Sequence, residues 1–171
     1  SFFSATYIKV DTNIFKFFKS DLKISEDLRY FDREFKGSSN IDMMLDSELE
    51  EGIKEPSFLT KLDALEAFLE KQEKSGKIVG YLDQLKQIRK AFSDNKKEFY
   101  KIPDSKPMTS QLLLLFENSG PDDDLSDIKD FDERFTRITL PTINMDASEY
   151  NQFLDDMMQT INKDFPDLNV T

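Results

Sequence analysis

One order of segments, an extended stretch, a helix and another extended stretch, occurs near both ends of this chain of 171 residues. In each extended stretch apolar and polar side chains alternate, whereas in each helical stretch the apolar side chains recur every three or four residues. The segments are residues 5–10, 25–36 and 40–46 near the start, and residues 135–143, 147–165 and 168–171 near the end. Two β-α-β units of this kind predict a small mixed sheet covered by helices, which is an α+β fold.

The middle of the chain carries apolar side chains at helical spacing, which indicates helices between the two units. A chain of this length is sufficient for one well-buried core but short for two full domains. We therefore expect a single domain over residues 1–171, with the sheet core formed by residues 5–47 and 126–171. Residues 56–120 are expected to form a helical insertion into this core.

Capping signals predict where several helices begin and end. Ser57 is a candidate N-cap for the first helix of the middle section, and Gly76 is expected to end that helix. Asp146 followed by Glu149 is a variant of the capping box and predicts the start of the last helix. The apolar stripe of this last helix comprises Tyr150, Phe153, Leu154, Met157, Met158 and Ile161.

The alternation in two predicted strands assigns their side chains to opposite faces of the sheet. In the strand at residues 40–46, Ile41, Met43 and Leu45 share one face and Met44 lies on the other. In the strand at 135–143, the residues that share one face are Thr136, Ile138 and Leu140. A further short strand is expected around residues 128–131.

Charge and composition exclude several classes of function. The chain has 34 acidic and 23 basic residues, giving a formal net charge of −11. Because such a chain is repelled by phosphate backbones and by anionic membrane surfaces, we expect no nucleic-acid partner. The absence of Cys and His removes disulfides, thiolate nucleophiles, imidazole bases and the usual zinc ligands. The longest apolar run, residues 112–116, is far shorter than a membrane span.

An acidic stretch partly fits the ligand spacing of an EF-hand calcium loop. Positions 1, 3, 5, 7, 9 and 12 of such a loop would be Asp122, Asp124, Ser126, Ile128, Asp130 and Glu133. Position 6 requires a glycine for its sharp turn and holds Asp127, and position 8 holds Lys129 where an apolar residue is usual. We therefore predict no EF-hand here and no metal site.

Three groups of neighbouring carboxylates could in principle perform acid–base chemistry. They are Asp122–Asp124, Asp155 with Asp156, and Glu50 with Glu51. Such chemistry requires the carboxylates to converge in a shielded pocket, and all three groups lie in polar stretches that predict a solvated surface. We therefore predict no catalytic residues, no cofactor and no enzymatic activity.

Two apolar features are the best candidates for contact with an apolar ligand. They are the run Leu112–Phe116 and the adjacent Met157 and Met158, since Met-rich and Phe-rich surfaces adapt to varied apolar partners. The ordinary interpretation of both features is core packing. The substrate-binding residues are therefore left unassigned.

The order of the segments also resembles a known family. The stretch IKVDTNIFKFF at residues 8–18 is similar to the segment after the first transmembrane helix of resistance–nodulation–division (RND) superfamily exporters. Other similar stretches follow in the same order along nearly the whole chain. They are the turn GSS at 37–39, the pattern Pro56-x-x-Leu59-x-x-Leu62, IVGYL at 78–82, QLLLLFENSG at 111–120, and residues 131–140 and 148–166.

The resemblance is closest to the branch with mycobacterial lipid exporters, hopanoid transporters and Patched-like sterol proteins. It implies two β-α-β units in a ferredoxin-like porter sandwich with an inserted helical middle section. The chain would be the first extracytoplasmic loop of a polytopic exporter, on the periplasmic side of the cell membrane. Its expected partners are the second extracytoplasmic loop and transmembrane helices of the same transporter, and a hydrophobic or lipid-like substrate. The family's proton-relay carboxylates lie in transmembrane helices, so none is assigned here.

The same resemblance predicts that Ser1 and Thr171 are ends of a piece of a longer protein, with hydrophobic helices before and after it. Two alternatives stay open. One is an independent acidic module that binds a protein partner through its helical middle section. The other, weaker alternative is a carboxylate-dependent hydrolase.

Overall fold

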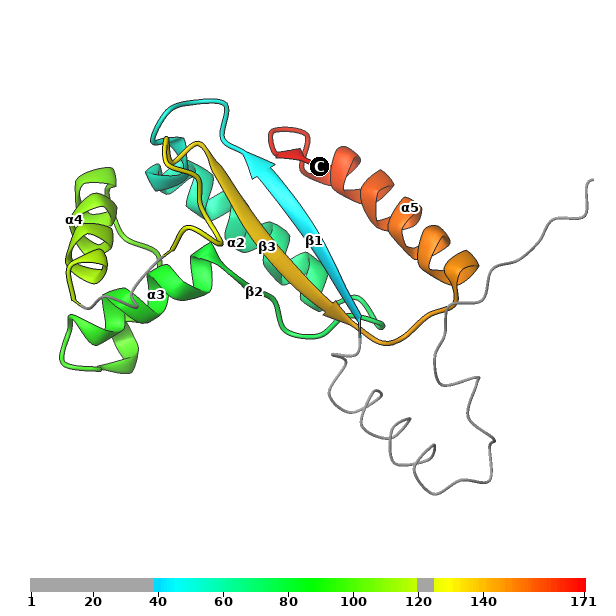
Figure 1. The fold of residues 1–171 in the computed structure, drawn as a ribbon, viewed down its shortest axis with the longest axis horizontal. Coiled ribbons are helices and arrows are strands. Elements are labelled where there is room, and N and C mark those ends of the chain that lie inside the picture. Colours follow the sequence, from blue (N-terminus) through cyan, green and yellow to red (C-terminus); the bar gives the residue numbers. More distant parts are fainter. Residues whose placement is uncertain (1–38, 120–124) are drawn as a thin grey trace, which may run out of the picture.

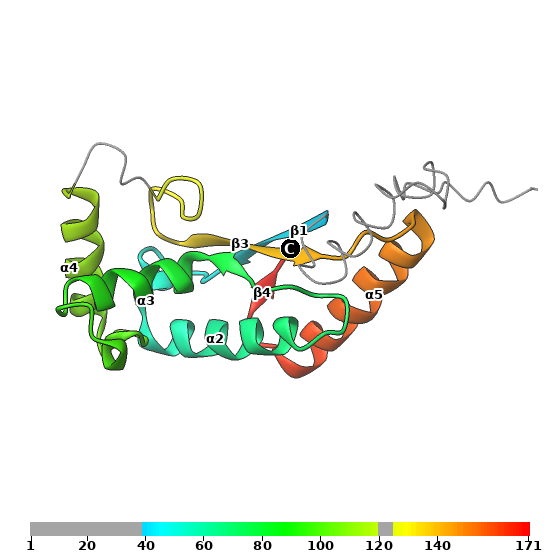
Figure 2. The same cartoon turned by 90° about the horizontal axis from the view of Figure 1, so that it is seen from below.

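An antiparallel sheet with helices packed against one of its faces forms the framework of this protein (Figures 1 and 2). The computed structural model describes residues 39–119 and 125–171. The strands are β1 (Ser39–Asp46), β2 (Val79–Gly80), β3 (Phe135–Thr142) and β4 (Asn169–Val170). The helices are α2 (Pro56–Glu70), α3 (Tyr81–Ala91), α4 (Lys106–Glu117) and α5 (Ala147–Asp164), with short 3-10 helices η2 (Gly52–Lys54) and η3 (Lys97–Phe99). The predicted α+β class is confirmed.

The sheet has the strand order β2-β3-β1-β4, and each neighbouring pair is antiparallel. The central pair, β1 and β3, runs from Ser39 opposite Thr142 to Asp46 opposite Phe135. β2 and β4 are short edge strands, which pair with β3 and with the end of β1 respectively. Segments from the beginning and the end of the described chain therefore lie side by side.

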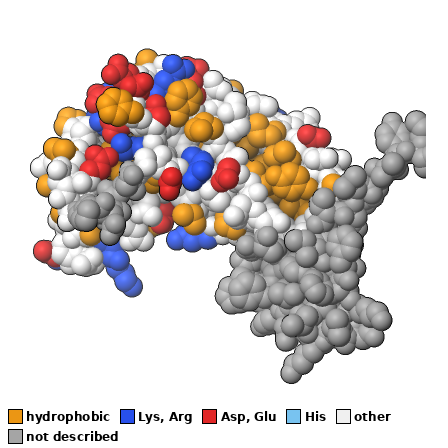
Figure 3. All heavy atoms as spheres, viewed as in Figure 1, with side chains coloured by type: hydrophobic (Ala, Val, Ile, Leu, Met, Phe, Trp, Pro, Cys, Tyr) orange, Lys and Arg blue, Asp and Glu red, His pale blue; other side chains and the backbone are white. Residues whose placement is uncertain are grey.

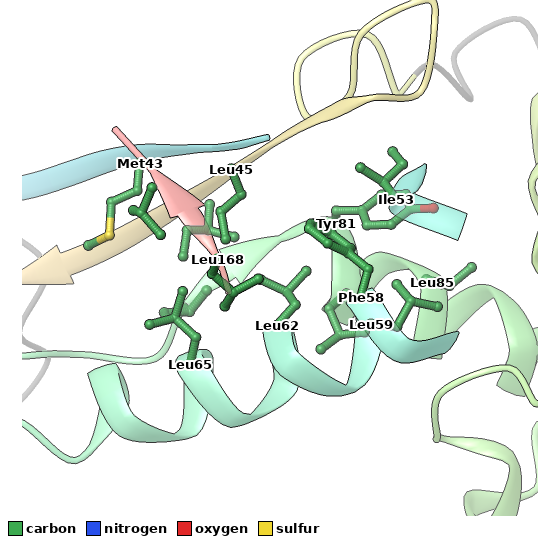
Figure 4. Close-up of a cluster of buried hydrophobic side chains, with 14 of the residues drawn as sticks. Met43, Leu45, Ile53, Phe58, Leu59, Leu62, Leu65, Tyr81, Leu85 and Leu168 are labelled. Atoms are coloured by element: carbon green, nitrogen blue, oxygen red, sulfur yellow. The ribbon is translucent and has the colours of Figure 1, made fainter. Parts of the chain in front are cut away.

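Alternation along β1 and β3 decides which side chains enter the core, as the sequence predicts. Met43 is buried, whereas Met44 on the other face is 44% exposed. The buried side chains of the two strands are Ile41, Met43, Leu45, Thr136, Ile138, Leu140 and Thr142. Figure 4 shows Leu62 and Leu65 of α2 on the side of the core opposite Met43 and Leu45.

The position of α2 and β2 differs from the predicted division of the chain. Residues 56–120 were expected to be an insertion, but the leucines of α2 share one core with the sheet, and β2 is a strand of that sheet. The reason is topological: α2 crosses from β1 to β2, so its apolar stripe covers the inner face of the strands. The predicted strand at 5–10, the helix at 25–36 and the turn at 37–38 lie outside the described residues.

The start of α5 is the one that the capping signal predicts. Asp146 is its N-cap, and one carboxylate oxygen accepts a hydrogen bond from the backbone N–H of Glu149 at 2.9 Å. By contrast, the strand expected around residues 128–131 does not form. This segment forms turns, and its pairing with β3 is limited to one isolated antiparallel β-bridge between Lys129 and Thr136.

The predicted ends of α2 are wrong. Its first residue is Pro56, because proline lacks an N–H and its fixed φ suits the first helical position, so Glu55 rather than Ser57 precedes the helix. The helix ends at Glu70, well before Gly76. The N–H of Gly76 instead donates to the carbonyl of Pro141 at 2.7 Å, which ties the connection after α2 to β3.

Helices α3 and α4 pack together at one end of the sheet (Figure 1). α4 begins at Lys106, because the side chain of Ser105 caps it by accepting a hydrogen bond from the backbone N–H of Met108. The segment between these helices is held by the buried side chain of Arg89, which lies 2.7 Å from Asp104 and also donates to the carbonyl of Ile102. This ion pair lowers the pKa of Asp104 below its usual range.

Candidate ligand-binding groove

A groove of about 620 Å³ lies between α5 and the end of α2, together with the residues that follow α2. Its apolar part comes from Phe68 on α2 and from Phe153 and Met157 on α5. The two α5 residues are four positions apart and therefore lie on the same face of the helix. The polar residues that line the groove are Gln72, Glu73, Lys74, Asp146, Ser148, Glu149, Gln152, Asp156 and Thr160.

Packing beneath the groove fixes its apolar wall. Met157 is buried in the core, while Phe153 is half-buried and packs against that core. The ring of Phe68 lies 5.7 Å from the ring of Phe165, measured between centroids, in a tilted arrangement. These contacts join the end of α2 to the end of α5, so that the wall is formed by two elements far apart in the sequence.

One cation and several carboxylates surround this apolar wall. The Nζ atom of Lys74 lies 2.7 Å from a carboxylate oxygen of Glu149 and 6.0 Å from the centroid of the Phe153 ring. Glu73, Asp146, Glu149 and Asp156 make the lining net negative, since Lys74 is its one basic residue. An apolar wall with a mainly acidic rim is suited to an amphiphile whose head group is zwitterionic or cationic.

The two apolar features that the sequence offers as contacts for an apolar ligand lie in different parts of the structure. Met157 lines the groove, and its neighbour Met158 is half-buried. The run at 112–116 lies on α4, away from the groove. Its first two leucines are buried, but Leu114 is 61% exposed and Leu115 is 43% exposed.

The two described carboxylate pairs, Asp155 with Asp156 and Glu50 with Glu51, do not converge in a shielded site. Asp155, Asp156, Glu50 and Glu51 are all exposed. Glu51 pairs with Lys54, and the hydrogen bond from that lysine lowers the pKa of the Glu51 carboxyl. The group at 122–124 lies outside the described residues.

Glu133, the twelfth position of the tested calcium loop, is an ion-pair partner of lysines. It pairs with buried Lys54 and lies 3.3 Å from the Nζ of Lys129. Burial alone would lower the pKa of Lys54, but the hydrogen bonds to Glu133 and Glu51 outweigh it and the pKa is raised. Among residues 39–119 and 125–171, no three or more acidic side chains are grouped so that they could hold a metal ion.

The sequence interpretation missed one unusual acid, Glu66 of α2. Its side chain is only 9% exposed, and burial raises its pKa to about 7. The available signal was its spacing: Glu66 follows Leu62 by four positions and precedes Leu69 by three, which places it beside the buried stripe.

Comparison of the chain with the profiles of known protein families, with curated proteins and with solved structures finds no match. Within the described part of the chain, no helix combines the length and the apolar composition that crossing a membrane requires. The arrangement of the chain's own residues is therefore the basis for assigning a function.

Proposed function

We propose that this chain is an extracytoplasmic porter domain of an RND-superfamily exporter, which contributes to the capture and passage of an amphiphilic, lipid-like substrate. The observation that carries the proposal is the strand order β2-β3-β1-β4. The domain itself performs no chemical reaction and holds no cofactor.

The topology supports the porter assignment. β1, α2 and β2 form one β-α-β unit, and β3, α5 and β4 form a second. The strands of the two units interleave in one antiparallel sheet, and α2 and α5 lie on the same side of that sheet (Figure 2). This interleaved order, with α3 and α4 between β2 and β3, supports the ferredoxin-like arrangement that the resemblance to RND porter domains implies.

The face of the sheet opposite α2 and α5 is the surface proposed to bind a partner from the same transporter. Met44 and Arg137 are exposed on this face, and Phe135 is half-buried. Figure 3 views this face and shows charged side chains over the strands, with a group of hydrophobic side chains beside α5. In the proposed assembly, the second extracytoplasmic loop packs against part of this mixed surface, at the periplasmic side of the membrane.

The groove supports an amphiphilic substrate, and its aromatic wall provides the test. The probe is a zwitterionic single-chain lipid, lauroyl-lysophosphatidylcholine, titrated into the 171-residue chain below its micelle concentration. Phe153→Ser removes apolar contact area and is expected to weaken binding about tenfold, which corresponds to about 1.4 kcal/mol. Phe92→Ser makes the same change at an exposed position outside the groove and should leave the affinity unchanged. Equal affinity for both variants, or no saturable binding by the parent chain, contradicts the substrate assignment.

The proposal that this chain is part of a transporter is tested separately, by the sequence of the gene that encodes it. The reading frame is expected to encode hydrophobic helices on both sides of residues 1–171 and a second, similar loop further on. Exposure of Leu114 and Leu115 favours the second candidate, an independent module that binds a protein through α4. A reading frame without hydrophobic helices would overturn the exporter assignment in favour of that module.

A further inference from the structure

A second cavity, of about 240 Å³, lies between α2, the start of α3 and the residue that follows η3. Four carboxylates line it: Asp63, Glu66, Glu70 and Asp83. The basic residues of the lining are Lys77 and Lys86, so the cavity has an excess of negative charge. None of these residues lines the groove between α2 and α5.

Three of the four carboxylates have partners within the protein. Asp63 lies 2.5 Å from the Nζ of Lys86, and Glu70 accepts a hydrogen bond from the backbone N–H of Ile78 at 2.9 Å. Asp83 accepts a hydrogen bond from the hydroxyl of Tyr100 and lies 3.6 Å from the Nζ of Lys77.

Glu66 is different, because its Oε1 atom is buried and has no hydrogen-bond partner in the described part of the chain. A buried polar atom without a partner is costly, and the cost is larger when the group is ionised. A cation that enters the cavity would therefore find one carboxylate whose interactions with the protein are incomplete.

The lining distinguishes between a metal ion and an organic cation. The carboxylates are not grouped as metal ligands: the described residues hold no set of three or more acidic side chains placed for that role. An aromatic ring, in contrast, attracts organic ammonium groups. The ring of Tyr100 lines the cavity, and the Nζ of Lys86 already lies 6.0 Å from its centroid.

We propose that this cavity binds a small organic cation with a primary ammonium group, for which Glu66 is the counter-ion and the ring of Tyr100 is the aromatic wall. The volume of the cavity limits the ligand, or the part of it that enters, to an ammonium group on a short alkyl chain. This site is independent of the lipid-like substrate proposed for the groove.

The probe for this site is propylammonium chloride, titrated into the 171-residue chain and followed by amide chemical shifts. The expected result is saturable binding with a Kd of about 1 mM or below, and with shifts at Ile78 and Tyr100 that border the cavity. The titration is run at about pH 8.5, where Glu66 is ionised and the amine is still protonated. At about pH 5 binding should weaken at least tenfold, because Glu66 is then neutral.

Variants separate a specific site from general attraction to an acidic protein. Glu66→Gln should weaken binding at least tenfold, whereas Glu50→Gln, which makes the same change at an exposed residue that does not line the cavity, should have no effect. Because a buried amide could disturb folding, Tyr100→Leu provides a second variant at a half-exposed position, with an expected loss of about threefold.

Neutral 1-propanol, which has nearly the same size, should not bind. The proposal is overturned if Glu66→Gln binds propylammonium as tightly as the parent chain, or if 1-propanol binds equally well. It is also overturned if the parent chain shows no saturation by about 10 mM, well above the expected Kd.

Discussion

Glu66 and Glu50 carry the same carboxylate, but their surroundings give them different physical properties. Glu50 is exposed to solvent, whereas Glu66 lies beside the leucine stripe of α2 with one oxygen atom unpartnered. Burial disfavours the charged form of Glu66 and raises its pKa from 4.5 to about 7. The positive charge of Lys86 favours the charged form and offsets part of this increase. The folded protein therefore binds a proton on Glu66 in a pH range where the unfolded chain has released it.

This linkage predicts how stability changes with pH. Since the folded pKa of Glu66 is raised, its contribution to the free energy of unfolding falls as pH rises from 4.5 to about 7. The difference between the unfolded and the folded pKa of Glu66 corresponds to about 3 kcal/mol in the free energy of unfolding. In Glu66→Gln this loss should disappear, so the difference in stability between parent and variant should change by about that amount from about pH 5 to about pH 8. Urea unfolding at the two pH values measures it.

Other acids titrate in the same experiment, so a matched control is needed. Asp46 has a pKa lowered by its hydrogen bonds with Arg134, and its stabilising contribution is lost as pH falls. Comparison with Glu50→Gln removes such shared contributions, because that variant should follow the parent chain at both pH values. An identical pH dependence in Glu66→Gln and in the parent chain would contradict the linkage.

At the scale of the element, the apolar run of α4 lies partly in the core and partly at the surface. Leu112 and Leu113 are buried, whereas Leu114 and Leu115 are exposed. The division follows from helical geometry, because successive residues are separated by about 100° around the axis and one face alone can contact α3. The sequence identifies the helix, but four consecutive leucines do not indicate which face is buried.

Two substitutions in α4 test this division. Leu113 is 2% exposed, and Leu113→Ala removes buried contacts and leaves a cavity, so it should lower the free energy of unfolding by about 2–5 kcal/mol. Leu114→Ala makes the same chemical change one position later on the exposed face and should stay within about 0.5 kcal/mol of the parent chain. Chemical denaturation of both variants provides the comparison. Similar losses in the two variants would show that the exposed face of α4 is covered in solution.

At the scale of the whole molecule, the central β1–β3 pair holds the two β-α-β units together. β1 lies between β3 and β4, and its inner face packs against α2. Exposing this pair requires the whole core to open. The segment at residues 93–101, by contrast, lies outside the sheet, is mostly exposed, and contains left-handed backbone at Asp94 and Asn95.

Hydrogen exchange should therefore divide the molecule in two. Amides of β1 that bond to β3 should exchange only through global unfolding, at least about a thousandfold more slowly than the amides of residues 93–101. The measurement is native-state exchange followed by two-dimensional NMR. Low concentrations of urea should accelerate the β1 amides more than those of 93–101, because only global unfolding exposes large surface. Equal protection in both regions would show that the sheet is not the cooperative centre.

The agreement between sequence and structure is best where a pattern is local. Alternation placed Met43 inside and Met44 outside, and the capping box placed the start of α5 at Asp146, because neighbouring backbone geometry determines both features. The prediction was wrong for the start of α2, where Pro56 outweighed Ser57. It also missed Glu66, since an acid beside an apolar stripe ordinarily extends into solvent.

The sequence by itself determined the periodicity of strands and helices, the acidic surface and the absence of thiol and imidazole chemistry, because these depend on residue type and on spacing along the chain. Only the tertiary structure decided the strand order, the contribution of α2 to the sheet core, and the two cavities. Each of these brings together residues distant in sequence, such as Phe68 with Phe153 and Glu66 with Tyr100. Their proximity results from the packing of the complete core, which no local pattern specifies.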